Sequence, residues 1–438
     1  MKTRISILIA LCMAFTAFAS CSDDNNDAPK KELPVSADTQ TEPEIGETMP
    51  KWTEGNLEIH SISTGRGESN FYILPDGTTM LVDAAGSLVT QAICDRLGVG
   101  GVTPPRPDAS VSATDVSLRY IRHFNPRGLY VDYFVNSHFH EDHMGSWPEK
   151  YPEFPVITKH PVGNFYVNGL AGLGSTLIFE KIIDRGYTLP VTLATSDRMR
   201  DYLRFLKWTM DTNGTVYETA KVGHEDQIVL KYNPSAYPGF NIRILYASGY
   251  AWTGTGSETV RTIPLKASEI SGGNPDGNIY SIAMMLSFNK FNLYTAGDLQ
   301  WEAPAGMDWQ NQEAPIVSVV NKVEVMKGSH HGSTNANSTE LVNKLRPDVL
   351  WVNPWRTEQP GIPAIRRFVA ANPDIDIFST NIAEGSREPL AEAADRFRSW
   401  NGHIVFRVRP DGDYMVYVLD DSNEDYRVKA IFGPYKSN

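Results

Sequence analysis

A succession of short β-rich runs, separated by helical stretches, constrains the fold of this chain more than any other feature. Several runs are continuous apolar stretches, as strands covered on both faces should be. The runs occupy residues 57–63, 71–75, 79–84, 130–137, 226–232, 241–248, 280–288, 291–298, 323–329, 348–353, 374–380, 403–408 and 414–419. Helical stretches lie at 194–210, 338–345, 362–371 and 388–400. Many strands with interspersed helices predict packed sheets flanked by helices, in one large domain over residues 51–438.

The segment from about 148 to 220 interrupts the strand pattern and predicts a helical insertion. It is rich in aromatic residues and glycine, and it ends in a helical run that carries four basic side chains. These are Arg198, Arg200, Arg204 and Lys207. Two interpretations remain open: an amphipathic helix with a solvated basic face, or a cap helix that meets an anionic substrate.

The first 20 residues have the features of a secretory signal peptide. Lys2 and Arg4 precede an apolar run from Ile5 to Ala19, which is too short to span a bilayer. Small residues then stand before Cys21, an arrangement that resembles a bacterial lipobox. We expect cleavage before Cys21 and a lipid anchor on its thiol. The alternative is ordinary signal cleavage beside an incidental cysteine.

Residues 21–50 are expected to form the lipidated cysteine and a disordered acidic tether. Residues 22–50 contain eight acidic residues, two basic residues and no aromatic residue. Such a segment cannot bury enough apolar surface to fold alone, and its reach is roughly 30 Å. The run SDDNND at 22–27 resembles the surface-export signal of Bacteroidetes lipoproteins. We therefore expect an exported outer-membrane lipoprotein on the cell surface, with a solvated linker as the alternative reading of this run.

Charge and cysteine content limit the partners and the chemistry. The net charge is −12 at pH 7, whereas proteins that coat duplex nucleic acid are normally basic. We expect no stable binding of duplex nucleic acid, although a short nucleic acid in a metal site remains compatible. Of the three cysteines, Cys12 is lost with the signal peptide and Cys21 carries the lipid, so Cys94 is alone. The mature chain therefore has neither an internal disulfide nor a cysteine zinc cluster.

The strongest chemical signal is the sequence NSHFHEDHMG at 136–145, directly after a predicted strand. It contains His138, His140, Asp142 and His143, and imidazole and carboxylate groups are good ligands for zinc and similar cations. In a loop that leaves a strand, the first two histidines can point the same way while Asp142 and His143 turn toward a second position. The spacing suits two adjacent metal ions. The alternative is a coincidental histidine-rich turn.

Three further strand ends carry polar residues of the same kind. Asp298 follows a strand in a Gly-Asp pair, and His330 and His331 follow another strand. Asp83 also ends a strand, where its carboxylate can accept a hydrogen bond from a metal-binding histidine and so orient the ring.

These motifs, in this order, resemble the metallo-β-lactamase fold, and more closely the metallo-hydrolase domain of ComEC-type DNA-uptake proteins. Those proteins carry a VGQGDS-like turn, an LxDxG strand, HxHxDH, a TGD strand and an HHGS loop. The matching segments here are 64–69 (TGRGES), 81–86 (LVDAAG), 138–143, 296–298 (AGD) and 330–333 (HHGS), with 278–281 (NIYS) before the TGD strand. The resemblance covers about residues 55 to 410. It implies an α/β fold, namely an αββα sandwich with the metals at one edge.

The resemblance also implies a role for each motif residue. His138 and His140 would bind a first metal, Asp142 and His143 a second, Asp298 both, and one of His330 and His331 would complete the second position. Many members of the superfamily have another histidine about twenty residues before the bridging aspartate, where this chain has Asn278. The first metal is then held less tightly, or its coordination is completed by water.

The implied activity is hydrolysis by a metal-activated hydroxide, with two zinc ions as the expected cofactor and manganese or iron as alternatives. We assign catalysis to Asp142 and His331. Adjacent residues do not easily point the same way, so one histidine of the pair should bind metal and the other protonate the leaving group. We expect His330 to be the ligand because it is nearer the strand end.

The expected substrate is a small-molecule or polymeric phosphodiester. Two alternatives remain: a hydrolase of another ester or amide, or an inactive surface binding protein that keeps the fold. The turn has Arg66 where the family usually has glutamine and Glu68 where it has aspartate. The sequence also lacks the membrane-spanning helices that would form a DNA channel, which argues against DNA uptake but leaves hydrolysis intact.

Overall fold

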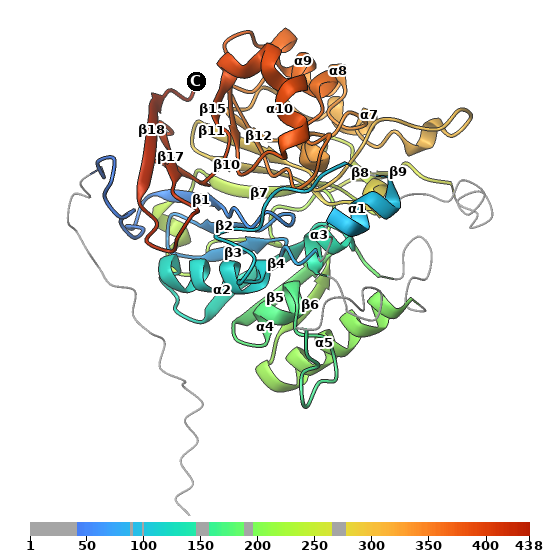
Figure 1. Ribbon diagram of the computed structural model, residues 1–438. Helices are drawn as coiled ribbons and strands as arrows, with labels where there is room; N and C mark the ends of the chain where they lie inside the picture. Colours follow the sequence, from blue (N-terminus) through green and yellow to red (C-terminus); the bar gives the residue numbers. More distant parts are fainter. Residues whose placement is uncertain (1–41, 88–90, 99, 146–156, 188–195, 265–276) are drawn as a thin grey trace, which may run out of the picture. The chain divides into compact units, whose positions relative to one another are not determined.

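The structure is a computed structural model, which describes residues 42–87, 91–98, 100–145, 157–187, 196–264 and 277–438 (Figure 1). The predicted signal peptide, Cys21 and the tether up to residue 41 lie outside the described residues. The described residues all belong to one compact unit.

Two nine-stranded sheets form the centre of the fold. The first contains, in spatial order, β18 (Val428–Tyr435), β17 (Tyr414–Leu419), β16 (His403–Val408), β1 (Leu57–Ser61), β2 (Asn70–Ile73), β3 (Thr79–Val82), β4 (Tyr130–Asn136), β5 (Ile178–Asp184) and β6 (Val216–Thr219). The second contains β15 (Phe397–Ser399), β14 (Asp376–Ser379), β13 (Val349–Val352), β12 (Val325–Lys327), β11 (Phe291–Thr295), β10 (Ala283–Phe288), β7 (Phe240–Ala247), β8 (Tyr250–Trp252) and β9 (Thr259–Arg261). Neighbours from β3 to β6 and from β11 to β15 pair in parallel, and the other pairs are antiparallel.

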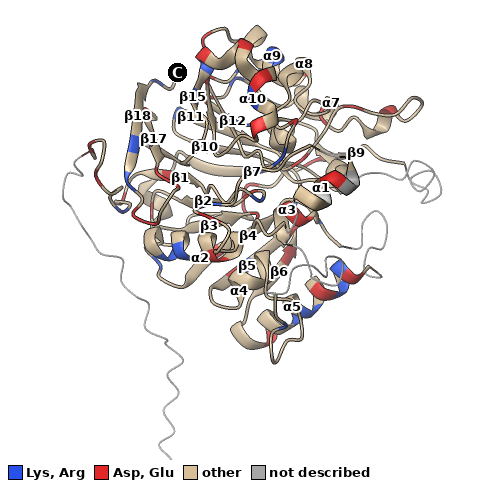
Figure 2. Ribbon diagram, in the orientation of Figure 1, with Lys and Arg blue, Asp and Glu red and all other residues tan. Residues whose placement is uncertain are grey.

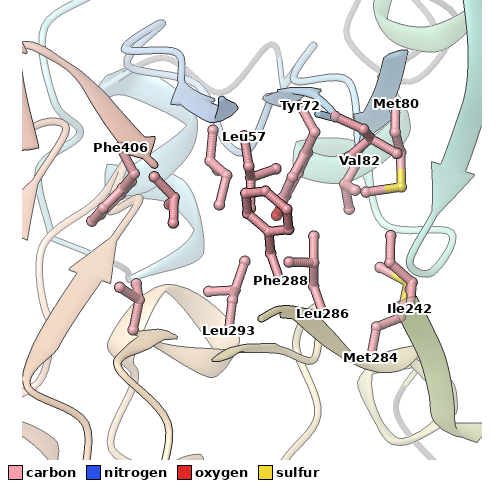
Figure 3. Packing of buried hydrophobic residues seen from close by; sticks show 14 of the residues in the cluster. Leu57, Tyr72, Met80, Val82, Ile242, Met284, Leu286, Phe288, Leu293 and Phe406 are labelled. Carbon is pink, nitrogen blue, oxygen red and sulfur yellow. The ribbon is translucent and has the colours of Figure 1, made fainter. Parts of the chain in front are cut away.

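Apolar side chains fill the space between the two sheets. Those drawn in Figure 3 include Leu57, Tyr72, Met80, Val82 and Phe406 from the first sheet, and Ile242, Met284, Leu286, Phe288 and Leu293 from the second. All of them are buried, and burying an aliphatic or aromatic side chain contributes roughly 1.5–3 kcal/mol. This shared core explains why strands on both sides of it read as continuous apolar runs.

Helices cover the outer face of each sheet. The first sheet packs against α2 (Ala113–Phe124), α4 (Gly169–Gly174) and α5 (Asp197–Asn213). The second packs against α7 (Ala314–Val317), α8 (Thr339–Leu345), α9 (Ile362–Ala371) and α10 (Glu384–Leu390). The remaining short elements are α1 (Gln91–Leu97), α3 (Glu141–Met144) and the single turns η1 (Pro234–Ala236), η2 (Gly277–Tyr280), η3 (Asp308–Gln310), η4 (Ser329–Gly332) and η5 (Ala391–Arg396). The expected αββα sandwich of the metallo-β-lactamase type is therefore confirmed.

Two expected elements are wrong, the second only in part. Residues 226–232 form no strand, although Ile228 and Leu230 are buried as a strand would bury them. The backbone N–H groups of the intervening residues donate to side chains and not to a paired strand. The Val229 N–H donates to the Tyr133 hydroxyl, and the Lys231 N–H donates to the Thr78 hydroxyl. The helix expected at 388–400 is wrong at its C-terminal end: α10 continues to Leu390 and the helical turns of η5 to Arg396, but residues Phe397–Ser399 form β15.

The segment at about 148–220 contributes strands as well as helices. β5 and β6 extend the first sheet in parallel beyond β4, while α4 and α5 cover its outer face. The segment is therefore part of the sandwich. Basic and acidic residues alternate along α5 (Figure 2), where Lys207 pairs with Asp211 at 2.6 Å and Arg200 pairs with Asp197. These exposed pairs match the interpretation of a solvated helix face.

The folded part begins before Lys51, inside the range that we assigned to the tether. Thr48 forms a β-bridge with Arg427, and Met49 is buried among the apolar side chains between the first sheet and the helices that cover it. Within the described part of the chain, no helix combines the length and the apolarity needed to cross a bilayer.

Candidate metal centre

The predicted site residues lie at the carboxyl ends of parallel strands. Asp83 follows β3, His138 follows β4, Asp298 follows β11 and His330 follows β12. The carboxyl ends of parallel strands meet at one edge of a sheet, which is where such folds usually bind ligands. Motifs that are far apart in sequence therefore converge at one edge of the sandwich.

The loop after β4 gathers the first histidines. The ring centroids of His138 and His140 lie 4.6 Å apart, and those of His138 and His143 lie 4.2 Å apart. The turn at 64–69 packs on this loop, because the Glu68 N–H donates to the Asp142 carbonyl at 2.9 Å. Gly67 has a φ of 117°, and a Cβ atom there would lie 2.1 Å from that same carbonyl oxygen. Only glycine allows so close an approach.

Two groups of donor atoms share Asp298. One contains Glu68, His143, Asp298 and His331, and the other contains His138, His140 and Asp298. Within each group the candidate ligand atoms all lie within 4.8 Å of one another. Asp142 borders the first group, with its Oδ2 atom 2.9 Å from His331 Nε2 and 3.9 Å from His143 Nε2. Asp298 is the residue common to both groups.

Several buried atoms of this cluster have no hydrogen bond. His138 Nε2 has no hydrogen-bond partner among the described residues. His143 Nε2 and Asp298 Oδ1 lie 3.1 Å apart without hydrogen-bond geometry. Buried polar atoms are normally paired, and imidazole nitrogen with carboxylate oxygen is the donor set that zinc, manganese and iron accept. The residues present therefore fit divalent metal ions.

The other ring nitrogen, Nδ1, has a polar partner in His143, His331 and His330. His143 Nδ1 is 2.8 Å from Asp83 Oδ2, as expected for Asp83, and Ser137 donates to both oxygens of that carboxylate. His331 Nδ1 lies 3.0 Å from the Asn353 carbonyl, and His330 Nδ1 lies 2.8 Å from Asn335 Oδ1. Histidines that bind metal are usually oriented in this way, with Nε2 left for the ion.

Both histidines of the pair reach the same carboxylate. His330 and His331 have φ values of 53° and 55°, so two consecutive residues adopt the left-handed conformation. Their Nε2 atoms lie 3.8 Å and 3.6 Å from Asp298 Oδ2. The expectation that adjacent residues diverge is therefore wrong here, because it assumed ordinary extended backbone. Two such residues are uncommon outside glycine, and this strain is typical of functional sites.

The two histidines differ in exposure and partners. The His331 side chain is fully buried, whereas that of His330 is 13% exposed. Asn278 donates to His330 Nε2 at 3.3 Å, and a Cβ atom at the preceding Gly277 would lie 2.8 Å from His140 Nε2. Asn278 therefore borders the candidate site.

The buried carboxylates at this edge of the sandwich favour positively charged neighbours. Burial alone would lower the pKa of His143, but the carboxylates of Asp298 and Asp83 outweigh it and raise that pKa well above its usual range. In the same way the pKa of His331 rises to about 9, against the effect of burial, because Asp298, Asp142 and Glu68 surround it. Burial and the neighbouring imidazoles of His143 and His140 instead hold the pKa of His138 well below its usual range. Either protons or metal cations can supply the required charge.

Sequence reasoning did not give roles to four residues that shape this site. Lys327 forms an ion pair with Glu68 at 2.7 Å, and both side chains are buried. The Trp355 indole donates to Asp142 Oδ2 at 2.8 Å. Arg198 of α5 donates to the Phe139 carbonyl at 2.6 Å and pairs with Glu141, so it braces the histidine loop. In the sequence, Glu68 lies within the motif at 64–69, Lys327 lies in the expected strand before the paired histidines and Arg198 belongs to the basic helical run, but no signal marked Trp355.

Two arginines stand beside the cluster without an acidic partner. Arg66 donates to the carbonyls of Gly65 and Thr103, and the Arg356 guanidinium lies 5.6 Å from the Trp355 ring centroid. Neither pairs with a carboxylate of the described residues. Both lie near Cys94, where their charges oppose the rise in thiol pKa that burial causes. A cavity of about 530 Å³ adjoins this corner and is lined in part by Arg66 and by hydroxyl side chains.

Comparisons with known proteins give structural likeness only. No family model matches the chain, and no curated protein matches it. A protein from Parabacteroides distasonis, provisionally described as a metal-dependent hydrolase, is 12% identical, with 74% of this chain and 92% of that one covered and a TM-score of 0.31. A metallo hydrolase from Ignicoccus hospitalis is 12% identical, with 80% and 98% covered and a TM-score of 0.32. An isothiocyanate hydrolase from gut bacteria of Delia radicum is 12% identical, with 78% and 95% covered and a TM-score of 0.34. Likeness at this level carries no argument about activity.

Proposed function

We propose that this protein is a metal-dependent hydrolase that cleaves phosphodiester bonds. The observation that carries the proposal is the shared carboxylate of Asp298, which belongs to both groups of metal-type donors. The cluster contains the carboxylates of Glu68, Asp83, Asp142 and Asp298 but a single ammonium, that of Lys327. This surplus of negative charge suits two divalent cations.

The unpaired arginines favour an anionic substrate over a neutral ester or amide. Arg66 belongs to the turn that carries Glu68, and the charge of Arg356 adds to the effect of burial in lowering the pKa of His330; neither arginine pairs with a carboxylate of the described residues. Guanidinium groups recognise phosphate oxygens through charge-assisted hydrogen bonds. A neutral substrate would leave both charges uncompensated at the mouth of the site.

In the proposed mechanism, bound metal ions would lower the pKa of a water molecule and offset negative charge on the substrate. His138, His140, Asp142, His143, Asp298 and His331 would hold them. His331 is fully buried against Asp142 and is better placed as the ligand, while the partly exposed His330 can reach a leaving group and protonate it. From the sequence we expected the opposite roles, with His330 as the metal ligand and His331 as the proton donor. Arg66 and Arg356 would orient the phosphate.

The test is a metal-dependent substrate comparison on the full chain. Protein stripped with a chelator is reloaded with zinc, manganese or iron(II) and assayed with bis(p-nitrophenyl) phosphate, p-nitrophenyl acetate and a chromogenic β-lactam. We expect phosphodiester hydrolysis that depends on metal and that His138→Ala abolishes. A protein that binds two metals but hydrolyses only the ester or the β-lactam would contradict the phosphodiester proposal. A protein that binds metal and hydrolyses nothing would favour the inactive binding protein.

We also propose the location that the N-terminal sequence predicts, a lipid-anchored protein at the cell surface. If Cys21 carries the anchor, Cys21→Ala should release the protein from the membrane fraction. Replacing Asp23, Asp24 and Asp27 by alanine should reduce its accessibility to protease on intact cells. Unchanged membrane association of Cys21→Ala would contradict the lipid anchor.

A further inference from the structure

One buried cation connects three loops of the candidate metal centre. Lys327 is the last residue of β12, and its ammonium lies 2.7 Å from Glu68 Oε1. The same ammonium donates to the carbonyl of Gly297 at 3.1 Å and to that of Gly328 at 3.4 Å. Glu68 belongs to the turn at 64–69, Gly297 precedes Asp298, and Gly328 opens the loop of the paired histidines. The ammonium therefore fixes these three loops relative to one another.

The partner of this cation faces a histidine of the site. Glu68 Oε1 lies 3.2 Å from His331 Nδ1, which also has the Asn353 carbonyl at 3.0 Å, so the carboxylate acts on this nitrogen together with a backbone acceptor. Asp83 Oδ2 hydrogen-bonds His143 Nδ1 at 2.8 Å. Carboxylates behind metal-binding histidines fix the orientation of the ring. The two carboxylates differ because only Glu68 has an ammonium of its own.

We propose that Glu68 and Lys327 form a buried positioning pair that orients His331 and sets the affinity of the metal position formed by His143, Asp298 and His331. The pair suits this role because its two charges cancel. A lone ammonium would repel a nearby cation, and a lone carboxylate would bind the cation itself or be left unpaired. As an ion pair they orient the ring and leave the charge of Asp298 and Asp142 to the metal. The inference rests on the metal centre proposed above and goes beyond it in assigning residues that would not touch the substrate.

The experiment compares two buried ion pairs by double substitution in the full chain. A single substitution leaves a lone buried charge and is prone to unfold the protein, so the test variant is Glu68→Gln/Lys327→Met. The matched control is Glu58→Gln/Arg407→Met, which removes a pair 2.7 Å apart between β1 and β16 that is equally buried. Each protein is stripped of metal and titrated with zinc in competition with a chromophoric chelator, and the cobalt(II) absorption spectrum is recorded as metal is added.

We expect the test variant to bind one zinc as the wild type does and the second about 10–100-fold more weakly, with altered cobalt bands for the second equivalent only. The control should bind both ions with wild-type affinity. A folded test variant that binds both zinc ions as tightly as the wild type overturns the proposal. If that variant does not fold, Glu68→Gln/Lys327→Gln, which also removes both charges but keeps polar side chains at both positions, must show the same selective loss. A wild-type protein that binds no zinc overturns the metal centre itself, an outcome distinct from failure of the pair.

Discussion

Two buried polar clusters in this protein differ in how completely their atoms are paired. Between β1, β16 and α2, Glu58 accepts from Arg407 at 2.7 Å and lies 3.0 Å from His60 Nε2. The other ring nitrogen of His60 is 3.0 Å from the Tyr120 hydroxyl. Every carboxylate oxygen of Glu58 and every ring nitrogen of His60 thus has a partner. Arg407 Nη1 has no hydrogen bond among the described residues but lies 3.7 Å from Glu42 Oε2.

The cluster at the edge of the sandwich is built from the same residue types but is left incomplete. His138 Nε2, His143 Nε2 and Asp298 Oδ1 have no hydrogen bond among the described residues. A purely structural network in this state would lose free energy for each unpaired atom. The comparison indicates that one cluster holds the fold together on its own, while the other is completed by something the chain does not supply. Cations are the natural candidates, since carboxylates outnumber ammonium groups there.

The largest effect should come from Asp298→Asn, which removes the charge common to both donor groups. We expect the variant to lose both metal ions and at least ~10³-fold in hydrolysis, because the several kcal/mol that metal supplies to the transition state disappear. The metal-free variant should be less stable than the metal-free wild type, because the charge of Asp298 compensates the imidazoles of His143 and His331, which, against the effect of burial, hold the pKa of its carboxyl well below the usual range. Metal content, turnover and urea unfolding measure these outcomes.

The control for this prediction is Asp413→Asn, which alters a partly exposed carboxylate that pairs with Lys436. It should change neither metal content nor rate. Retention of both metals by Asp298→Asn would contradict a bridging role.

The next effect separates the paired histidines. His331→Ala should reduce both metal content and rate, because its buried ring faces Asp142 and Asp298. His330→Ala should keep both metals but lose roughly 10²–10⁴-fold in rate if its imidazole is the general acid. Metal stoichiometry and turnover are measured side by side. The reverse pattern would restore the assignment expected from the sequence, and full activity in both variants would make the loop structural.

The sequence predicted the convergence of residues that follow strand ends. His138, Asp298 and the histidine pair follow β4, β11 and β12, and parallel strands bring such residues together. The sequence did not predict ion pairs between residues that are far apart in the chain. Glu68 and Lys327 meet across 259 positions of sequence, and no local pattern announces this.

The errors in the fold have a similar origin. The alternation of Ile228 and Leu230 is real, but side chains of other segments take the hydrogen bonds that a neighbouring strand would have taken. At 388–400 the helical composition is correct up to Arg396 and fails only beyond it, because Phe397 pairs with β14. Local propensity is overridden by tertiary contacts in both places.

A third prediction concerns the cluster around Glu58. Arg407→Met removes the guanidinium from the buried Glu58 carboxylate, leaving only His60 beside it, and should destabilise the protein by about 3–5 kcal/mol. Adding Glu58→Gln should recover part of that loss, because both charges are then absent. Metal content should stay at the wild-type level in each variant. Urea unfolding and metal analysis test this, and loss of metal in either variant would show that the two clusters are not independent.

The smallest effect is a pH dependence in the same region. Burial, reinforced by the nearby His60, lowers the pKa of His403 from its usual 6.5 to about 3, and Asp420, Lys429 and Arg106 are the other charged groups that act on it. Its Nδ1 atom accepts from the Ser63 N–H at 3.0 Å, and its ring packs on Tyr120 with centroids 4.6 Å apart.

The folded protein therefore keeps His403 neutral, whereas the unfolded chain binds a proton there below pH 6.5. The contribution of this histidine to stability is full above pH 6.5 and is lost as the pH falls toward 3. Between pH 7 and pH 5 the loss should be about 2 kcal/mol.

His403→Asn keeps an acceptor for Ser63 but cannot take up a proton, so its free energy of unfolding should fall less over this interval. Urea unfolding at both pH values is the measurement, with His224→Asn as the control, since His224 lies in an exposed turn beside Asp226. Equal pH slopes for the wild type and His403→Asn would show that the buried imidazole takes up its proton without opening the fold, and the paired cluster would then be less rigid than its hydrogen bonds indicate.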